Sequence, residues 1–247
     1  MQTQKLRYEI TTYNYNSIPG SPIAYWASNE FIKNYENETL GNIGEAKSGI
    51  QTENNDLYLK FWFEVNNNDI AFNTKSKKEY LSTHKKWIPQ VKGGDYRRWY
   101  GNLDYVINWE NDGKEIKTCA GCRLNAMANE KYYCIGGITW SHTTSSYYSA
   151  RFLSEGILFN VEAPTYFVED DKKKYILAFL NNIVAQYYFD AINPTVHYLV
   201  GNVLKLPIKM TDNFEGIGEK VDKNIKSSKE DWDSFETSWD FKKHPLI

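Results

Sequence analysis

The stretch ILFNVEAPTYFVEDDKKKYILAFLNNIVAQYYFDAINP, residues 157–194, contains the two patterns from which we predict the fold. Its beginning, 157–168, is rich in β-branched and aromatic residues, which is typical of a strand. After Asp170 or Asp171, which can cap a helix, apolar residues recur every three or four positions until Asn193-Pro194. A strand followed by an amphipathic helix indicates an α+β chain.

The sequence on either side of this stretch predicts further strands and helices. Runs typical of strands occupy 57–65, 99–109, 137–144 and 196–208. Ser21 followed by Pro22 is an N-cap with a first-turn proline and predicts a helix over 22–36. Aromatic residues at helical spacing in 212–240 predict a terminal helix. We therefore expect an α+β fold with a β-rich body, peripheral helices and a C-terminal helical tail.

Length and composition narrow the class of protein. A chain of 247 residues with 41% hydrophobic residues can bury a core, and a formal net charge of −2 excludes a uniformly basic nucleic-acid binder. Three cysteines are too few for a disulfide scaffold, so a reducing compartment is expected. The sequence contains neither an apolar run of membrane-spanning length nor an apolar leader, which predicts a soluble, cytoplasmic protein.

Charge is unevenly distributed along the chain. Residues 75–98 carry eight Lys and Arg against two acidic residues, whereas 212–240 carry nine acidic residues against four Lys. At the end of the basic window, two glycines permit close approach of the backbone to a phosphate. Arg97 and Arg98 can form bidentate hydrogen bonds with phosphate or guanine. Trp99 and Tyr100 can stack on an unpaired base or belong to the core. The residues alone leave open whether this segment is a nucleic-acid face or a soluble basic loop.

The loop at 49–56, Gly-Ile-Gln-Thr-Glu-Asn-Asn-Asp, is rich in amide side chains. Amide side chains pair well with the edge of adenine, so the loop is a candidate for base contacts. An ordinary surface loop has the same composition, and that alternative stays open.

Two clusters could hold a metal ion. Asp112, Glu115 and Lys117 resemble the carboxylate and lysine cluster of magnesium-dependent nucleases, although a solvated turn has the same spacing. The second cluster is a potential zinc site, for which buried or loop thiols are the alternative; it comprises Cys119, Cys122, Cys134 and His142.

Two motifs of methyltransferases are incomplete here. The sequence FEGIG, 214–218, copies the loop that approaches S-adenosylmethionine, but a charged helix and the chain end follow it instead of a βα sheet. Asn193-Pro194 continues with Thr195 rather than with proline and an aromatic residue, so the catalytic tetrapeptide Asn-Pro-Pro-Tyr is not formed. We therefore expect no catalysis by this chain alone.

Several of these segments together carry a family resemblance. They are IPGSPIAYW (18–26), the loop at 49–55, KGGDYRRWYGN (92–102), VINWENDG (106–113), GITWS (137–141), NPT (193–195) and SWDFKKHPL (238–246). In this order they resemble the C-terminal part of PglX-type adenine-specific DNA methyltransferases of BREX phage-defence systems. Those enzymes are similar in turn to type IIG restriction–modification enzymes.

The resemblance implies a division of labour. Catalysis would lie upstream, in a Rossmann-like domain that binds S-adenosylmethionine, while this chain would hold no cofactor, no metal ion and no catalytic residue. Residues 1–21 would be a linker from that absent domain, 22–210 the target recognition domain and 211–247 an acidic helical spacer. The parent enzyme would flip an adenine from the duplex and methylate N6, and this segment would grip the DNA and select its sequence.

Contact residues follow from the same resemblance. Lys92, Arg97, Arg98 and Arg151 are expected to contact phosphate or guanine, and Gln51, Thr52, Asn54, Asn55 and Ser141 are candidates for base edges. Glu53 departs from the family pattern, which has glycine there, and adds a negative charge beside the expected DNA.

The expected partners are double-stranded DNA, the upstream methyltransferase domain and further defence-system proteins, with no membrane. Two rival functions remain. A protein-interaction module would use the acidic tail and the aromatic surface and would not depend on Arg97 and Arg98. A nuclease would require Mg²⁺ and Glu115.

Overall fold

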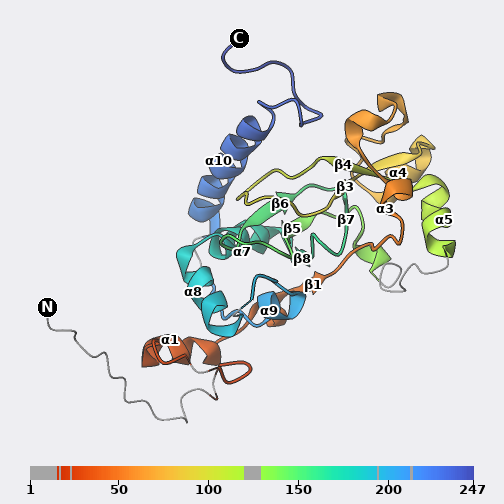
Figure 1. Cartoon of the computed structure of the whole chain (residues 1–247). Coiled ribbons are helices and arrows are strands. Elements are labelled where there is room, and N and C mark those ends of the chain that lie inside the picture. Colours follow the sequence, from red (N-terminus) through yellow and green to blue (C-terminus); the bar gives the residue numbers. More distant parts are fainter. Residues whose placement is uncertain (1–15, 17, 23, 120–128, 194, 212–213) are drawn as a thin grey trace, which may run out of the picture.

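Two four-stranded sheets and the helices around them form the chain (Figure 1). The computed structural model describes residues 16, 18–22, 24–119, 129–193, 195–211 and 214–247. The strands are β1 Glu45–Lys47, β2 Leu59–Phe61, β3 Trp87–Val91, β4 Tyr105–Asn108, β5 Gly137–Trp140, β6 Ala150–Leu153, β7 Leu158–Phe159 and β8 Thr165–Phe167. The α-helices are α1 Asn29–Lys33, α2 Leu40–Ile43, α3 Asn55–Tyr58, α4 Lys77–Thr83, α5 Glu110–Thr118, α7 Asp170–Leu180, α8 Ile183–Ile192, α9 Val200–Leu204 and α10 Phe214–Trp232. Short 3₁₀ turns are η2 Asn34–Glu36, η3 Trp62–Glu64, η4 Asn67–Asp69 and η5 Glu130–Tyr132.

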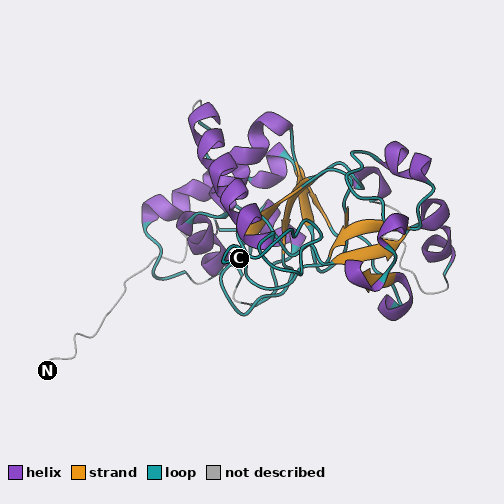
Figure 2. Cartoon of the chain, turned by 90° about the horizontal axis from the view of Figure 1, so that it is seen from above, coloured by secondary structure: helices purple, strands orange, loops and turns teal. Residues whose placement is uncertain are grey.

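Each sheet has its own core. The first sheet, in the order β1-β8-β5-β6, is antiparallel throughout, and the second, in the order β2-β4-β3-β7, ends in a parallel pair. Figure 2 shows the strands in these two separate groups. Trp140 and Ile176 are buried in the core of the first sheet, and Ile88 and Phe159 in that of the second. The mixture of helices and sheets confirms the predicted α+β class.

The strand predicted over 157–168 is two strands in different sheets. β7 pairs with β3, whereas β8 pairs with β1 and β5. Between them the Asn160 Oδ1 atom accepts hydrogen bonds from the N–H groups of Glu162 and Ala163, both at 3.0 Å, and turns the chain. An asparagine side chain that accepts hydrogen bonds from the backbone N–H groups two and three residues later favours a turn. This turn divides the apolar segment into two strands.

The single helix predicted after Asp170 is broken into α7 and α8. Asn181 donates to the Ala150 carbonyl at 2.9 Å and accepts from the Ala150 N–H at 3.0 Å, which ties the break to β6. Asn182 then caps α8 by accepting from the Val184 N–H at 3.0 Å. Two asparagines that compete for backbone groups end one helix and begin the next.

The helix predicted over 22–36 begins later. Ser21 has a φ of 47° and its N–H bonds the Ile18 carbonyl at 2.8 Å, so Ser21-Pro22 forms a turn. The cap of α1 is Ser28, whose hydroxyl accepts from the Phe31 N–H at 3.1 Å. The predicted start and cap were wrong because Ser21-Pro22 belongs to the turn that begins at Ile18, whereas the predicted range does contain helical structure at 29–36.

Four further predicted strands were wrong or too long. Residues 57–65 contain α3, the short strand β2 and η3, and residues 196–208 contain α9. Residues 99–102 include left-handed backbone at Trp99 (φ 72°) and Asn102 (φ 59°), so only β4 remains of the strand predicted over 99–109. The strand predicted over 137–144 shortens to β5.

The C-terminal helix is confirmed as α10. It packs against α7, where the Lys174 Nζ atom pairs with Asp222 at 2.6 Å, and it buries Val221 and Trp232 (Figure 1). Phe235, Trp239 and Phe241 follow the helix in turns rather than lying on its face. None of the helices that the structure describes is long and apolar enough to cross a membrane.

Candidate nucleic-acid interface

The glycine loop after β3 is built on protein contacts. Gly93 and Gly94 have φ values of 83° and 120°, which favour glycine. A Cβ atom on Gly93 would lie 2.6 Å from the Glu162 carbonyl oxygen, so the side chain is excluded by the backbone of the β7–β8 turn. The Ser141 hydroxyl donates to the Gly94 carbonyl at 2.8 Å. The loop is therefore fixed in shape before any partner arrives.

Lys92 connects two cavities. A cavity of about 150 Å³, here called the amide pocket, is lined by Ile50, Gln51, Thr52, Asn55, Gln90, Lys92, Asn160, Val161 and Glu162. A second cavity of about 430 Å³ lies over the glycine loop and is lined in part by Lys92, Arg97, Asp104, Tyr105 and Trp232. The structure thus brings together four predicted contact residues from two distant segments, namely Gln51, Thr52, Asn55 and Lys92.

The amide loop is held in place by its own side chains. The Thr52 hydroxyl donates to Asn55 Oδ1, which orients both groups at the mouth of the amide pocket. Asn54 has a different place, because its Oδ1 atom accepts from the Leu57 N–H at 3.1 Å and caps α3. Asn54 is exposed but does not line the pocket.

The two adjacent arginines have different surroundings. Arg97 Nη1 donates to Asp231 at 3.0 Å, and the guanidinium lies 4.9 Å from the ring centre of Trp232. Arg98 is exposed and lies 5.6 Å from the Tyr96 ring centre. A phosphate can approach Arg98 directly, whereas at Arg97 it competes with a carboxylate of α10.

Arg151 and Ser141 lie beneath this loop. Arg151 is fully buried, and its guanidinium donates to the Arg97 carbonyl at 3.4 Å and to the Ser141 hydroxyl at 3.2 Å. Burial lowers the pKa of Arg151 to about 10. Both side chains are buried, so neither can contact DNA at the surface in this structure. Their hydrogen bonds instead position the backbone of Gly94 and Arg97.

The end of α10 closes over the same loop. Lys229 lies 5.0 Å from the Tyr100 ring centre and pairs with Asp233 and Asp240, each at 2.7 Å. These hydrogen bonds outweigh partial burial and raise the pKa of Lys229. Tyr100 is buried, so it serves packing rather than stacking on a base. The end of the acidic tail thus faces residues 92–100, here called the basic loop.

Asp104 adds a carboxyl group to the second cavity. Burial raises its pKa above the ordinary value of an aspartate, while nearby Arg97 acts in the opposite direction. The neighbouring Tyr105 ring stacks on Phe61 with 4.6 Å between ring centres, and the Lys92 Nζ atom lies 5.0 Å from the Tyr105 ring centre. The cavity is therefore lined by both basic and aromatic residues and by two acidic ones, Asp95 and Asp104.

The candidate nuclease cluster forms an ion-pair network instead. Lys117 pairs with Asp112 at 2.8 Å and with Glu130 at 2.7 Å, and Lys77 pairs with the same two carboxylates. Glu115 accepts from the Asn108 amide at 3.3 Å. Asp112 and Glu130 are occupied by lysines, which accounts for their lowered pKa values against the opposing effect of burial.

The candidate zinc cluster is only partly within the described residues. Cys122 lies outside them, and Cys134 is a core residue whose pKa is raised to about 12 by burial. His142 instead contacts the Thr143 hydroxyl at 3.1 Å. Across the described part of the chain, no group of three or more His, Cys, Asp or Glu is placed to hold a metal ion.

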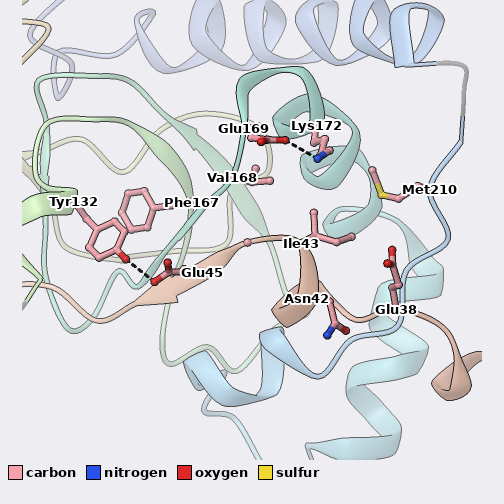
Figure 3. A pocket seen from close by; sticks show the side chains of 11 residues that line it. Glu38, Asn42, Ile43, Glu45, Tyr132, Phe167, Val168, Glu169, Lys172 and Met210 are labelled. Carbon is pink, nitrogen blue, oxygen red and sulfur yellow. Dashed lines mark hydrogen bonds and ion pairs between the residues drawn. The ribbon is translucent and has the colours of Figure 1, made fainter.

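Another cavity lies apart from this loop and is acidic. It measures about 520 Å³, and Figure 3 shows Glu38, Glu45 and Glu169 around it. Glu45 accepts from the Tyr132 hydroxyl, and Glu169 pairs with Lys172 at 2.5 Å. Three carboxylates against one lysine repel phosphate, so this cavity is not a candidate for nucleic acid.

Sequence reasoning missed Gln90, Asn160 and Asp104. Gln90 stands in the otherwise apolar strand WIPQV, and a polar residue inside such a strand is the signal that could have identified it. Asn160 and Asp104 had no comparable signal, because their neighbours come from distant parts of the chain.

Comparison with known proteins gives two long similarities, although no family model matches the chain. The chain is 36% identical over 256 residues to the adenine-specific methyltransferase PglX of Lacticaseibacillus casei (strain Zhang), covering 100% of the chain and 21% of that protein. It is 36% identical over 239 residues to the adenine-specific methyltransferase BrxX of Escherichia coli O9:H4 (strain HS), covering 95% of the chain and 18% of that protein. The chain spans about a fifth of the length of these relatives and is similar to one segment of each.

Proposed function

We propose, from the similarity of the whole chain to one segment of adenine-specific methyltransferases, that it binds double-stranded DNA and selects the sequence to be methylated. In this proposal 22–210 is the recognition domain and 211–247 is a spacer. The S-adenosylmethionine site, the methyl transfer and the role in BREX-type defence would belong to the remainder of a longer protein.

One observation carries the proposal. Lys92, a cation, lies beside Gln51, Thr52 and Asn55 at the amide pocket, although about forty residues separate the two segments. A cation for the phosphate backbone beside amides and hydroxyls for base edges is the combination that sequence-selective DNA binding requires. The exposed Arg98 on the adjoining loop widens the basic face.

DNA binding is measured by fluorescence anisotropy of a labelled random-sequence duplex at several salt concentrations. The proposal expects a Kd of about 10⁻⁴–10⁻⁶ M at physiological salt, weakening as salt rises. Lys92→Ala and Arg98→Ala should each lower the logarithmic salt slope by about 1, the value for one lost phosphate contact.

Lys205→Ala is the matched control. Lys205 is exposed and directly follows α9, a helix that lies apart from β3 in Figure 1. Its removal changes the net charge by the same amount but should leave the salt slope unchanged. The absence of DNA binding even at low salt, or an equal slope loss in all three variants, would overturn the proposal.

A second candidate function, protein interaction, has its own support. Ile183, Val184 and Tyr187 present an exposed apolar face on α8, and exposed Tyr147 lies next to Tyr148, whose N–H bonds Gln186 of the same helix at 2.9 Å. Exposed apolar clusters of this kind are typical of interaction surfaces. An upstream methyltransferase domain is the partner we propose for this face.

This second function is tested with Ile183→Lys combined with Tyr187→Lys. The double variant should lose co-purification with a separately produced S-adenosylmethionine-binding domain and keep the salt-dependent binding of the duplex. Retained co-purification would exclude the α8 face as that contact.

A further inference from the structure

The amide pocket contains a buried polar group that the fold does not use. Gln90 is 1% exposed, and its Nε2 atom has no hydrogen-bond partner among the described residues. A buried donor without a partner costs free energy, and such groups are uncommon in folded proteins. Replacing glutamine by an apolar residue would remove that cost, so the amide is explained if a ligand pairs with it.

Gln90 lies in β3, and Lys92 follows directly after that strand ends at Val91. Both residues line the amide pocket, so the end of β3 and the first residue after it contribute to the same cavity. Asn160 directly follows β7, the strand that pairs with β3, and also lines the pocket; its Oδ1 atom accepts from the N–H groups of Glu162 and Ala163. The Asn160 amide is therefore oriented with Nδ2 as the atom available to donate.

The lining chemistry selects a neutral polar ligand. Gln51, Gln90 and Asn160 offer amide donors and acceptors, while the charges of Lys92 and Glu162 oppose each other. A free phosphate would meet the Glu162 carboxylate, whereas a nucleobase edge carries donors and acceptors without charge. The volume of about 150 Å³ equals that of a cavity that admits one benzene-sized ring.

We propose that the amide pocket receives the hydrogen-bonding edge of one nucleobase of the bound DNA and that Gln90 determines which base is accepted. This inference rests on the proposed DNA-binding function and adds a specificity-determining residue to it. A base that stays paired would present its groove edge and a base that leaves the stack its Watson–Crick edge; both edges carry uncharged hydrogen-bond donors and acceptors.

The test is selection from a duplex library with a randomised centre, followed by sequencing of the bound DNA. The full chain should enrich a motif, and Gln90→Leu should lose about tenfold or more discrimination at one base position, the size expected of one bidentate pair. Enrichment at the other positions and binding to random duplex should stay within about twofold, because Leu has a similar volume and removes an unpartnered donor.

Thr74→Val is the matched control for folding effects. The Thr74 hydroxyl is a second buried atom without a partner among the described residues, and it does not line the amide pocket. Both variants should unfold at an equal or higher urea concentration than the original chain, and Thr74→Val should leave the selected motif unchanged.

The outcomes separate the two proposals. If the chain binds no DNA, the proposed function fails and this inference fails with it. If the chain binds DNA but Gln90→Leu selects the same motif at every position, only the inference is overturned. If Gln90→Leu does lose the selected base, a duplex that lacks the base opposite that position shows whether the selected base is paired or flipped out. Tighter binding indicates a flipped base, because unstacking costs less free energy without a pairing partner. Unchanged or weaker binding indicates a paired base.

Discussion

Arg97 and Asp231, 134 residues apart in the sequence, are joined by a hydrogen-bonded ion pair of 3.0 Å. The pair links the basic loop after β3 to the end of the acidic helix α10. It also places a carboxylate where a DNA phosphate would approach Arg97, so the tail and the DNA compete for the same guanidinium under the proposed function.

Asp231→Ala should strengthen DNA binding. Removing the carboxylate leaves Arg97 available for one more phosphate contact, which should raise the logarithmic salt slope by about 1. The Asp231 side chain is 63% exposed, so the free energy of unfolding should change by less than about 1 kcal/mol. Anisotropy titration and urea denaturation measure the two effects. Glu236→Ala, which removes an exposed carboxylate later in the same segment, should change the slope less; equal effects would point to net charge alone.

Asn181→Ala should destabilise the fold where α7 ends against β6. The variant removes the hydrogen bonds of 3.0 and 2.9 Å to the buried N–H and carbonyl of Ala150, a carbonyl that also accepts from the Trp99 N–H at 2.9 Å. Two lost buried hydrogen bonds cost about 2–4 kcal/mol, to be measured by urea denaturation. Asn182→Ala removes only the α8 cap and should cost about 1 kcal/mol. Equal losses would contradict the role assigned to Asn181.

The sequence predicted the fold class and the terminal helix better than the strands. α10 has a long amphipathic pattern that packing on α7 reinforces. The break at Asn181 and the turn at Asn160 depend on side-chain bonds to the backbone, and the bonds of Asn181 reach β6, on a distant part of the chain. The apolar periodicity continues through both positions and predicted unbroken elements, although asparagine favours turns and helix caps.

The sequence also predicted only part of the candidate site. Lys92, Gln51, Thr52 and Asn55 were identified by residue type and are neighbours in space. Sequence reasoning could not tell that Arg151 is buried or that Arg97 is paired with Asp231, because both facts depend on how β6 and α10 pack against the loop. Charge shows that a residue can bind phosphate, while burial decides whether it is accessible.

Lys229→Met should loosen the end of α10. Burial lowers the pKa of Lys229, but its hydrogen bonds to Asp233 and Asp240 outweigh that effect and raise it, so the stabilisation is complete at neutral pH and is lost as the pH rises from the pKa of an unfolded lysine through the folded-state pKa. Because these ion pairs are partly exposed, the loss should be about 1 kcal/mol at pH 7. Trp232 lies next to this contact, and its fluorescence reports the change. Lys226→Met, whose nearest carboxylate oxygen is 3.9 Å away on exposed Glu230, is the control and should have little effect.

Cys134 should resist thiol reagents as long as the chain is folded. Burial raises its pKa to about 12, so the thiol stays protonated at pH 8, and the side chain is 1% exposed. The thiolate is the reactive form, so alkylation by iodoacetamide should require unfolding. Mass spectrometry of chain treated with and without urea measures the modified fraction at each cysteine, with the less buried Cys119 as the internal comparison. Rapid modification of Cys134 without urea would mean that the core around β7 opens readily in solution.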